Sequence, residues 1–430
     1  MLGKENLINK QILIYGLGLS GKSCHKYLSK NNNIKIFDDN SSFRKNKNKD
    51  YFINKKQINK IRFDYIVISP GIDIKQCGLK DYLLKNRKKI ITELDIFCTA
   101  YPKNIKITIT GTNGKSTTCK MLHKIFKSKN LDVRLVGNIG NPPLLEKNIK
   151  KKTIFIVEAS SYQISYSNYL KTDYAVILNL SADHLERHGS INKYAKAKLK
   201  LIYNQDKNKQ SYIERNNNII NRNILYQKIK SKINKLNFKK ENFFRKKISN
   251  LYLLDKNNLN NIHFIYSICK KFGFSDTKIF KTLNNFKGLR FRKQIIYKNS
   301  RLKIINDSKS TSFSSTTPFL ETDEKIYWIL GGLFKKGDKF NLNKKNCKNI
   351  KAFIFGKDKK IFAKILKNKI KLNITKDLKE TLKIISKILK KEKNKITILF
   401  SPAAASFDQF KNFEQRGEYF NFLTKKYLLK

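Results

Sequence analysis

A glycine-rich segment after a short apolar run carries the clearest chemistry in this sequence. The run KITIT at 106–110 leads into GTNGKSTT at 111–118, and a helical pattern follows. Its two glycines let the backbone wrap around phosphate groups, and Lys115 could reach a terminal phosphate. The hydroxyl of Ser116 suits a magnesium ion. Although Ile109 stands where the full P-loop pattern has a glycine, the GKS core and its strand–loop–helix context predict a phosphate-binding loop.

A second glycine-rich loop lies near the start of the chain. GLGLSG at 16–21 follows the apolar run QILIY, and a second run, IKIF, ends at Asp38. Glycines in a GxGxxG spacing with an acidic residue about 20 positions later are typical of a dinucleotide-binding fold. The alternative is a tight turn in an ordinary βαβ unit. A further run, FDYIVIS, ends in SPGI at 69–72, which we expect at the same ligand-binding edge of the sheet.

Polar residues stand at the ends of two more apolar runs. Glu158 closes TIFIVE, and the segment after YAVILN contains Asp183 and His184. In a parallel sheet these side chains would emerge on the same edge as the phosphate loop. Each could be an ordinary loop residue, but together with that loop they suggest a magnesium site.

A lysine in the segment YAKAKLKLIY, at 194–203, is out of place. At helical spacing one face carries Tyr194, Ala197, Leu201 and Ile202, and Lys198 falls within it. Burial disfavours the charged ammonium form, and a neutral amine can take up carbon dioxide to give an anionic carbamate that suits magnesium. The alternative is that Lys198 extends its charged end past the tyrosine into water.

These residues require elements that bring them together. Apolar strand-like runs alternate with helical patterns through the 430 residues, which predicts α/β domains with parallel sheets. The alternating patterns divide the chain into three sectors, which predict domains at 1–94, 95–288 and 289–430. The Lys/Asn-rich stretch 205–250 is weakly periodic, so we expect it to be peripheral to the second domain.

The formal net charge of +60 is the most unusual bulk property. Its lysines are spread along the whole chain, so a nucleic-acid-binding patch is the less favoured interpretation, although acidic ligands should be attracted. Six scattered cysteines without a CxxC pair fit a reducing compartment. The opening MLGKENLINK has no apolar signal region and no run is long enough to span a bilayer, so we expect a cytoplasmic protein without membrane insertion.

Four segments of the chain resemble the Mur ligases, which build peptidoglycan precursors. They are GTNGKSTT at 111–118, VEASSYQ at 157–163, NLSADHLERHG at 179–189 and YAKAKLKLIY. The resemblance covers nearly the whole chain and implies three α/β domains: a Rossmann-like domain for the UDP-sugar, a central P-loop ATPase-like domain for ATP and magnesium, and a C-terminal Rossmann-like domain for the amino acid.

SPAAASFDQFKNFEQRG at 401–417 resembles the C-terminal signature of those members that add D-glutamate to UDP-N-acetylmuramoyl-L-alanine. The implied reaction consumes ATP, uses two magnesium ions and passes through an acyl phosphate, and we expect a monomer. One alternative is another Mur-type or folylpolyglutamate-type amide ligase with a different acceptor amino acid. The other is a non-enzymatic nucleic-acid-binding protein.

The resemblance also implies roles for individual residues. The expected ATP-binding residues are Gly111, Thr112, Asn113, Gly114, Lys115, Ser116, Thr117, Asn261, Arg292 and Asp307. The UDP-substrate would contact Leu19, Ser20, Asp38, Gly71, Asn138 and Gln163, and D-glutamate would contact Lys309, Thr311, Ser406 and Phe413. Magnesium would be held by Ser116, Glu158, His184 and carbamylated Lys198, and the catalytic residues would be Lys115, His184 and Lys198. The stretch NNLNN at 257–261, which ends at Asn261, departs from the family's HNxxN pattern because it lacks the histidine.

Overall fold

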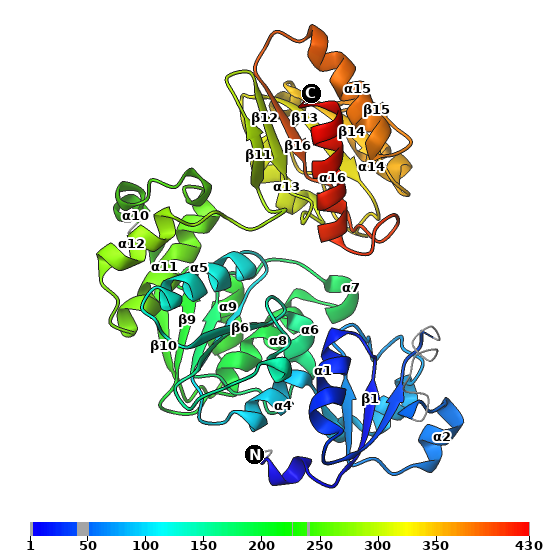
Figure 1. Cartoon of the computed structure of the whole chain (residues 1–430), viewed down its shortest axis with the longest axis vertical. Helices are drawn as coiled ribbons and strands as arrows, with labels where there is room; N and C mark the ends of the chain where they lie inside the picture. The colour runs from blue at the N-terminus through cyan, green and yellow to red at the C-terminus, as the bar shows by residue number, and fades with distance from the viewer. Residues whose placement is uncertain (1–2, 41–50, 226, 239–240, 430) are drawn as a thin grey trace. The chain divides into compact units, whose positions relative to one another are not determined.

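The computed structural model describes residues 3–40, 51–225, 227–238 and 241–429. The chain forms two compact units, residues 1–286 and 287–430, and three sheets follow one another along it (Figure 1). All but one of the paired strands run parallel, which confirms the predicted α/β class. The division of the first unit at residues 94 and 95 stays a prediction, and that boundary falls inside a helix, Glu93–Ala100.

The first sheet has the strand order β2-β1-β3-β4. Its strands are β1 (Gln11–Tyr15), β2 (Asn33–Phe37), β3 (Tyr65–Ile68) and β4 (Ile90–Ile91), and its helices are α1 (Leu19–Leu28), α2 (Lys55–Lys60), α3 (Lys80–Lys85) and α4 (Glu93–Ala100). Single 3-10 turns lie at Glu5–Leu7 and Arg87–Lys89. In β1, Ile12 and Ile14 belong to one buried cluster, while Leu13 and Tyr15 belong to another. Both faces of the sheet are therefore covered, as an all-apolar strand requires.

The second sheet, also in the first unit, has the order β10-β9-β8-β5-β7-β6. Its strands are β5 (Lys106–Thr110), β6 (Val133–Gly137), β7 (Ile154–Glu158), β8 (Tyr174–Ile177), β9 (Gln210–Glu214) and β10 (Lys232–Leu236). The helices are α5 (Lys115–Lys127), α6 (Ser161–Tyr166), α7 (Leu185–His188), α8 (Ile191–Tyr203), α9 (Asn218–Leu225), α10 (Glu241–Lys247), α11 (Lys256–Lys271) and α12 (Asp276–Asn284), with 3-10 turns at Pro143–Leu145 and Leu251–Leu253. Because β5 lies between β7 and β8, the loops after these three strands share one edge.

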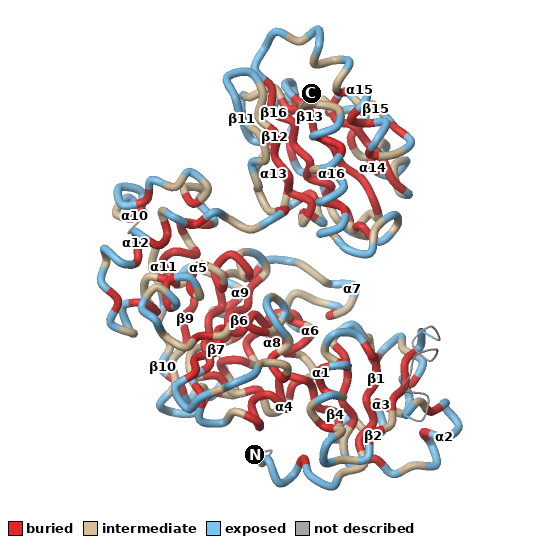
Figure 2. Tube along the Cα trace, in the orientation of Figure 1, coloured by how far each residue is buried: buried red, intermediate tan, exposed pale blue. Residues whose placement is uncertain are grey.

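The second unit contains one sheet in the order β11-β12-β16-β13-β14-β15, and only β11 is antiparallel. The strands are β11 (Gln294–Lys298), β12 (Leu302–Asn306), β13 (Lys325–Gly331), β14 (Ile350–Phe355), β15 (Lys371–Ile374) and β16 (Ile396–Phe400). The helices are α13 (Phe313–Leu320), α14 (Lys359–Leu366), α15 (Leu378–Lys391) and α16 (Phe413–Tyr427), with a 3-10 turn at Lys344–Cys347. Residues of α13 and α14 belong to one buried cluster and those of α15 and α16 to another, so helices cover both faces. The central strands β16, β13 and β14 form the buried interior (Figure 2).

The Lys/Asn-rich stretch 205–250 is more ordered than its composition suggests. Apart from residues 226 and 239–240, which lie outside the described part, it contributes β9, α9, β10 and α10. β9 pairs with β8, and β10 completes that side of the sheet as its edge strand. The stretch extends the sheet by two strands. β10 lies at the edge, but the central residues of β9 are buried inside the sheet, so the prediction of a peripheral stretch is wrong for β9.

None of the helices in the described ranges combines the length and apolar character that a bilayer crossing requires.

Candidate functional site

The phosphate loop lies between β5 and the start of α5, as its sequence predicts. Gly111 has φ 157° and Gly114 has φ 82°, and the latter value is strained for any residue with a side chain. A Cβ at position 114 would also lie 2.5 Å from Nδ2 of Asn261, which is buried on α11. The predicted nucleotide residue Asn261 therefore packs directly against the loop.

Lys115 folds back onto its own loop. Its Nζ donates hydrogen bonds to the carbonyl oxygens of Gly111 and Thr112, both at 2.8 Å. The next two residues, Ser116 and Thr117, carry hydroxyl groups and are both buried in the first turn of α5. An anion at this helix start would meet backbone N–H groups and the ammonium of Lys115 together.

The segment after β8 braces the phosphate loop. The N–H of Thr112 donates to the carbonyl of Asn179 at 3.0 Å, and the N–H of Asn113 donates to Oδ1 of Asn179 at 2.9 Å. The Thr112 and Tyr194 hydroxyls lie 3.2 Å apart, which ties the loop to α8. Asn179 was not among the predicted site residues, although the quoted motif NLSADHLERHG begins with it.

Lys198 is 1 % exposed, so the alternative in which its charged end reaches water is wrong. Its Nζ donates to the Gly111 carbonyl at 2.9 Å and to Oγ1 of Thr110 at 3.2 Å. Burial, aided by the nearby charge of Lys115, lowers the pKa of Lys198 well below its usual value, against the opposing influence of Asp183 and Glu158. The structure therefore favours a neutral amine at this position.

Glu158 ends β7 with its side chain 1 % exposed. Oε1 accepts a hydrogen bond from Nδ2 of Asn138 at 2.8 Å, while the buried Oε2 has no hydrogen-bond partner among the described residues. A buried carboxylate oxygen without a partner is costly and suits a site that receives a cation. Asn138 was predicted to contact the UDP-substrate, and in this structure it orients Glu158.

His184 precedes α7 in a left-handed conformation, with φ 52°. Its Nδ1 lies 2.7 Å from the Tyr162 hydroxyl, and its Nε2 lies 3.4 Å from Oδ2 of Asp183. A neighbouring histidine, His188, has its pKa lowered to about 4, chiefly by burial.

The predicted magnesium ligands fit a hard cation in part. Within the described residues, no three His, Cys, Asp or Glu side chains form a ready-made metal site. The oxygen donors are Ser116 and the partnerless Oε2 of Glu158, and a carbamate on Lys198 would add two more. His184 could bind the cation through Nε2, since its Nδ1 lies within hydrogen-bond distance of the Tyr162 hydroxyl.

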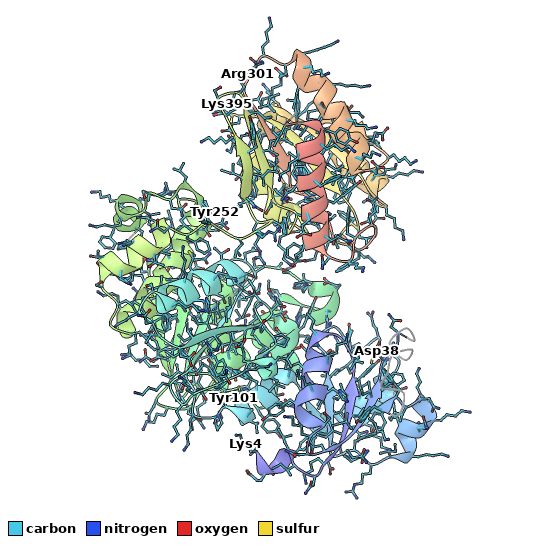
Figure 3. The ribbon with its side chains drawn as sticks, viewed as in Figure 1. Lys4, Asp38, Tyr101, Tyr252, Arg301 and Lys395 are labelled. Atoms are coloured by element: carbon cyan, nitrogen blue, oxygen red, sulfur yellow. The ribbon has the colours of Figure 1, made fainter. Side chains whose placement is uncertain are left out.

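The GLGLSG loop binds the carboxylate of Asp38, which lies after β2 (Figure 3). The N–H of Leu17 donates to Oδ2 of Asp38 at 2.7 Å. Leu19 and Ser20 open α1, and the Leu19 side chain is 79 % exposed. Gly71 is exposed, and a Cβ there would meet nothing within 4 Å. The two loops thus offer accessible positions for a ligand.

Gln163 is buried in the first turn of α6 and closes a capping box with Ser160. Its Oε1 accepts a hydrogen bond from the Ser160 N–H at 2.9 Å. In this structure Gln163 therefore stabilises the start of α6, and its predicted contact with the UDP-substrate stays a prediction.

In the second unit, two of the four residues predicted to bind D-glutamate come together. Nζ of Lys309 lies 4.2 Å from the ring centre of Phe413, a cation–π contact. Ser406 is buried after β16, and its carbonyl accepts a hydrogen bond from Phe410 N–H at 2.9 Å. Thr311 is exposed in the loop before α13. All four lie on segments that follow β12 or β16, which pair directly.

Asp307 and Arg292 also lie in the second unit. Burial raises the pKa of Asp307 to about 7, although hydrogen bonds from the Lys293 N–H and the Ser401 hydroxyl favour its ionised form. Phe291 and Lys293 have φ values of 60° and 49°, so Arg292 stands between two left-handed residues. Such a backbone is strained for side chains of this size.

Arg416 was not predicted, although it lies inside the C-terminal signature. It is 1 % exposed and donates to the carbonyls of Ser308 and Ala404 at 2.7 and 2.9 Å. These bonds join the loop after β12 to the loop after β16. The remaining hydrogen bond of the guanidinium that is seen in the described part of the chain joins Nε of Arg416 to Oγ of Ser308. Because most of the groups that Arg416 binds are backbone carbonyls, which every residue has, the sequence does not reveal its partners.

Known proteins resemble this chain in sequence along its whole length. Residues 109–275 match the family model of the Mur ligase middle domain. A UDP-N-acetylmuramoylalanine–D-glutamate ligase from Rickettsia bellii is 32% identical over 440 residues, covering 96% of each chain. One from Buchnera aphidicola subsp. Schizaphis graminum is 34% identical over 462 residues, covering 98% of this chain and 99% of the relative.

Two solved structures support the fold. A UDP-N-acetylmuramate–alanine ligase from Thermotoga maritima has a TM-score of 0.58 and 16% identity, covering 97% of this chain and 100% of that one. A MurF ligase from the same organism, in complex with ADP, has a TM-score of 0.57 and 15% identity, covering 99% and 97%. With the sequence matches, these establish that the chain belongs to the Mur ligases, and among them to the family of UDP-N-acetylmuramoylalanine–D-glutamate ligases.

Proposed function

We propose that this chain is an ATP-dependent amide ligase that joins D-glutamate to UDP-N-acetylmuramoyl-L-alanine in the assembly of peptidoglycan precursors. The observation that carries the proposal is the group of Lys115, Lys198 and Glu158 around the phosphate loop. Lys115 and Lys198 donate to the same carbonyl, and Glu158 ends the strand next to β5. Full-length relatives with this name, at 32% and 34% identity, support the choice of substrates.

The first step forms an acyl phosphate. A carboxylate oxygen of the L-alanyl group attacks the γ-phosphorus of ATP, the bond from that phosphorus to the β–γ bridging oxygen breaks, and ADP leaves. Lys115 and the N–H groups at the start of α5 would hold the transferring phosphoryl group in place.

The second step forms the amide. The amine of D-glutamate attacks the carbonyl carbon of the acyl phosphate, phosphate leaves, and the nitrogen gives up a proton. In the second unit, Lys309 would attract a carboxylate of the amino acid, and Ser406 and Thr311 offer hydroxyl donors. No protein nucleophile is needed, so the enzyme contributes positioning and charge.

We propose that magnesium is held by Ser116, Glu158, His184 and a carbamate on Lys198. The chemistry that magnesium would supply is neutralisation of negative charge on the ATP phosphates. A neutral Lys198 amine is the form that reacts with carbon dioxide, and Lys198 is buried beside the phosphate loop.

We also propose that the enzyme works in the cytoplasm as a monomer. Its six cysteines, all in the described part of the chain, form no disulfide there, which fits a reducing compartment. Gel filtration coupled to light scattering should give a mass near that of one 50.4 kDa chain.

An assay that measures ADP release tests this function. The enzyme is given ATP and UDP-N-acetylmuramoyl-L-alanine, and the acceptor amino acid is varied. D-glutamate should support ADP release, and L-glutamate, L-alanine and meso-diaminopimelate should not. Preference for another amino acid would identify a ligase of different specificity. ADP release that needs no amino acid would argue against ligation.

A further inference from the structure

Arg187, on the short helix α7, connects two segments of the first unit that are far apart in sequence. Its Nη1 donates to the carbonyl of Gly71 at 3.3 Å, and its Nη2 donates to the carbonyl of Ile72. Two successive carbonyls of the SPGI loop are therefore held by one guanidinium. Arginine suits this task because its donors form a rigid, planar fork.

Two tyrosines of α6 extend the connection. The guanidinium of Arg187 lies 4.2 Å from the ring centre of Tyr162, and the Tyr162 hydroxyl lies 2.7 Å from Nδ1 of His184. The Tyr166 hydroxyl lies 3.4 Å from Nη2 of Arg187 and accepts a hydrogen bond from the N–H of Ile74 at 3.2 Å. A continuous set of contacts thus runs from residues 71–74 to the imidazole of His184.

The backbone of His184 is in the left-handed region, with φ 52°, which is uncommon for residues with a side chain although histidine adopts it more often than most. It stands three residues before Arg187, at the start of the same four-residue helix. A shift of the SPGI loop would therefore reach His184 by two routes, through the helix and through the Tyr162 ring.

We propose that Arg187 is a positioning residue that couples the SPGI loop to the orientation of His184. The loop's occupant would be a uridine diphosphate group, so the proposal rests on the proposed function for the identity of the ligand. Occupation of the loop by that group would fix the carbonyls that Arg187 binds and, through Tyr162, fix the imidazole. An arginine that merely attached two surface segments would leave the His184 ring unaffected.

The ring signals of His184 test the coupling directly. In protein whose histidines carry ¹³C at Cε1 alone, one ring signal is expected from each of the five histidines, and His184→Gln identifies the relevant one. Without any ligand, Arg187→Gln should move that signal, and Tyr166→Phe, which keeps the ring and removes only the hydroxyl, should move it less. Arg62→Gln, at an exposed arginine before β3, is the matched control and should leave it in place. An unmoved signal in Arg187→Gln would overturn the proposal.

Addition of UDP gives the second arm. Saturating UDP should shift the His184 signal of the wild-type protein. In Arg187→Gln, UDP at a concentration that saturates the variant should cause no such shift. A shift that persists in the saturated variant would contradict coupling through Arg187.

Kinetics separate positioning from general damage. Arg187→Gln and Arg187→Lys should raise the Michaelis constant for the UDP-substrate more than that for ATP, because Arg187 holds the SPGI loop and touches no predicted ATP-binding residue. Equal changes in both constants would indicate a structural role only. Failure of the proposed function would appear differently, as a wild-type enzyme that forms no amide with D-glutamate although the ligand-free signals behave as expected.

Discussion

Lys115 and Lys198 donate hydrogen bonds to the same atom, the carbonyl oxygen of Gly111, at 2.8 and 2.9 Å. The proposed chemistry requires opposite protonation states of these two lysines. Lys115 must be charged to hold a phosphate, whereas Lys198 must be neutral to react with carbon dioxide. Burial favours the neutral form of Lys198, because its side chain is almost completely enclosed. The nearby charge of Lys115 lowers the pKa of Lys198 further.

Replacement of Lys115 with alanine should reduce ADP formation by about a hundredfold or more, because a point charge on the transferring phosphoryl group is lost. Circular dichroism and the melting temperature should stay close to wild type. Lys127→Ala, at an exposed lysine on the same helix α5, is the control and should keep full activity. Activity of Lys115→Ala within tenfold of wild type would refute its role in phosphate binding.

Replacement of Lys198 with alanine should nearly abolish activity, and acetate at high concentration should restore part of it by supplying an anionic oxygen. Lys198→Arg should not be restored, because its guanidinium stays charged and fills the space. Methylamine is the comparison: recovery with the amine alone would mean that Lys198 acts as a cation, which excludes the carbamate.

Replacement of Asp307 with asparagine should change how stability depends on pH. The pKa of Asp307 is about 7 in the folded protein, above the value near 4 of an unfolded aspartate. The unfolded chain therefore releases this proton first as pH rises, and the wild type loses stability between about pH 4 and 7, by at most about 4 kcal/mol.

The melting temperature of the wild type, relative to that of Asp307→Asn, should fall as the pH is raised through this range. Asp323→Asn, at an exposed aspartate of the same unit, provides the matched control. A constant difference between wild type and Asp307→Asn would contradict the raised pKa.

Secondary-structure elements explain why the phosphate loop and its neighbours could be predicted while other parts could not. The strand ends of β5 and β7 and the segment after β8 were expected on one edge, and the strand order confirms this. The helical spacing placed Lys198 within an apolar face but left open whether its charged end reaches water, and the structure shows that it is buried. These features depend on local patterns of apolar residues, which the sequence displays directly.

Neither β9 nor the edge strand β10 was predicted, because β9 has a short apolar run within a Lys/Asn-rich stretch and an edge strand lacks the continuous apolar run of a buried parallel strand. β10 has the sequence KINKL, and none of its residues is buried. Arg187 and Arg416 were missed for a different reason. Both bind backbone carbonyls of distant segments, so no residue type marks their partners.

The segments after β12 and β16 carry the residues that are predicted to bind D-glutamate. Lys309→Ala and Ser406→Ala should each raise the Michaelis constant for D-glutamate more than that for ATP, because a carboxylate loses a cationic or hydroxyl donor. Steady-state kinetics with each substrate varied in turn would measure this. Equal effects on the two constants would instead indicate general damage to the second unit.

The whole molecule carries a net charge of +60, and the substrates proposed for it are all anions. Basic surfaces raise the local concentration of anions and speed their association, and salt weakens the effect. The charge therefore agrees with ATP, a UDP-sugar and glutamate as ligands but selects none of them. The choice among them depends on the site, and the central claim is that a carboxylate is activated there by phosphoryl transfer from ATP.

Oxygen transfer tests that claim most directly. UDP-N-acetylmuramoyl-L-alanine labelled with ¹⁸O in the alanyl carboxylate is incubated with the enzyme, ATP, magnesium and D-glutamate, and the phosphate and the UDP product are analysed by mass spectrometry. If the carboxylate is activated as an acyl phosphate, each released phosphate should contain one ¹⁸O atom. The UDP-sugar product should carry one additional glutamyl residue. Unlabelled phosphate, or labelled AMP in its place, would contradict the acyl-phosphate mechanism.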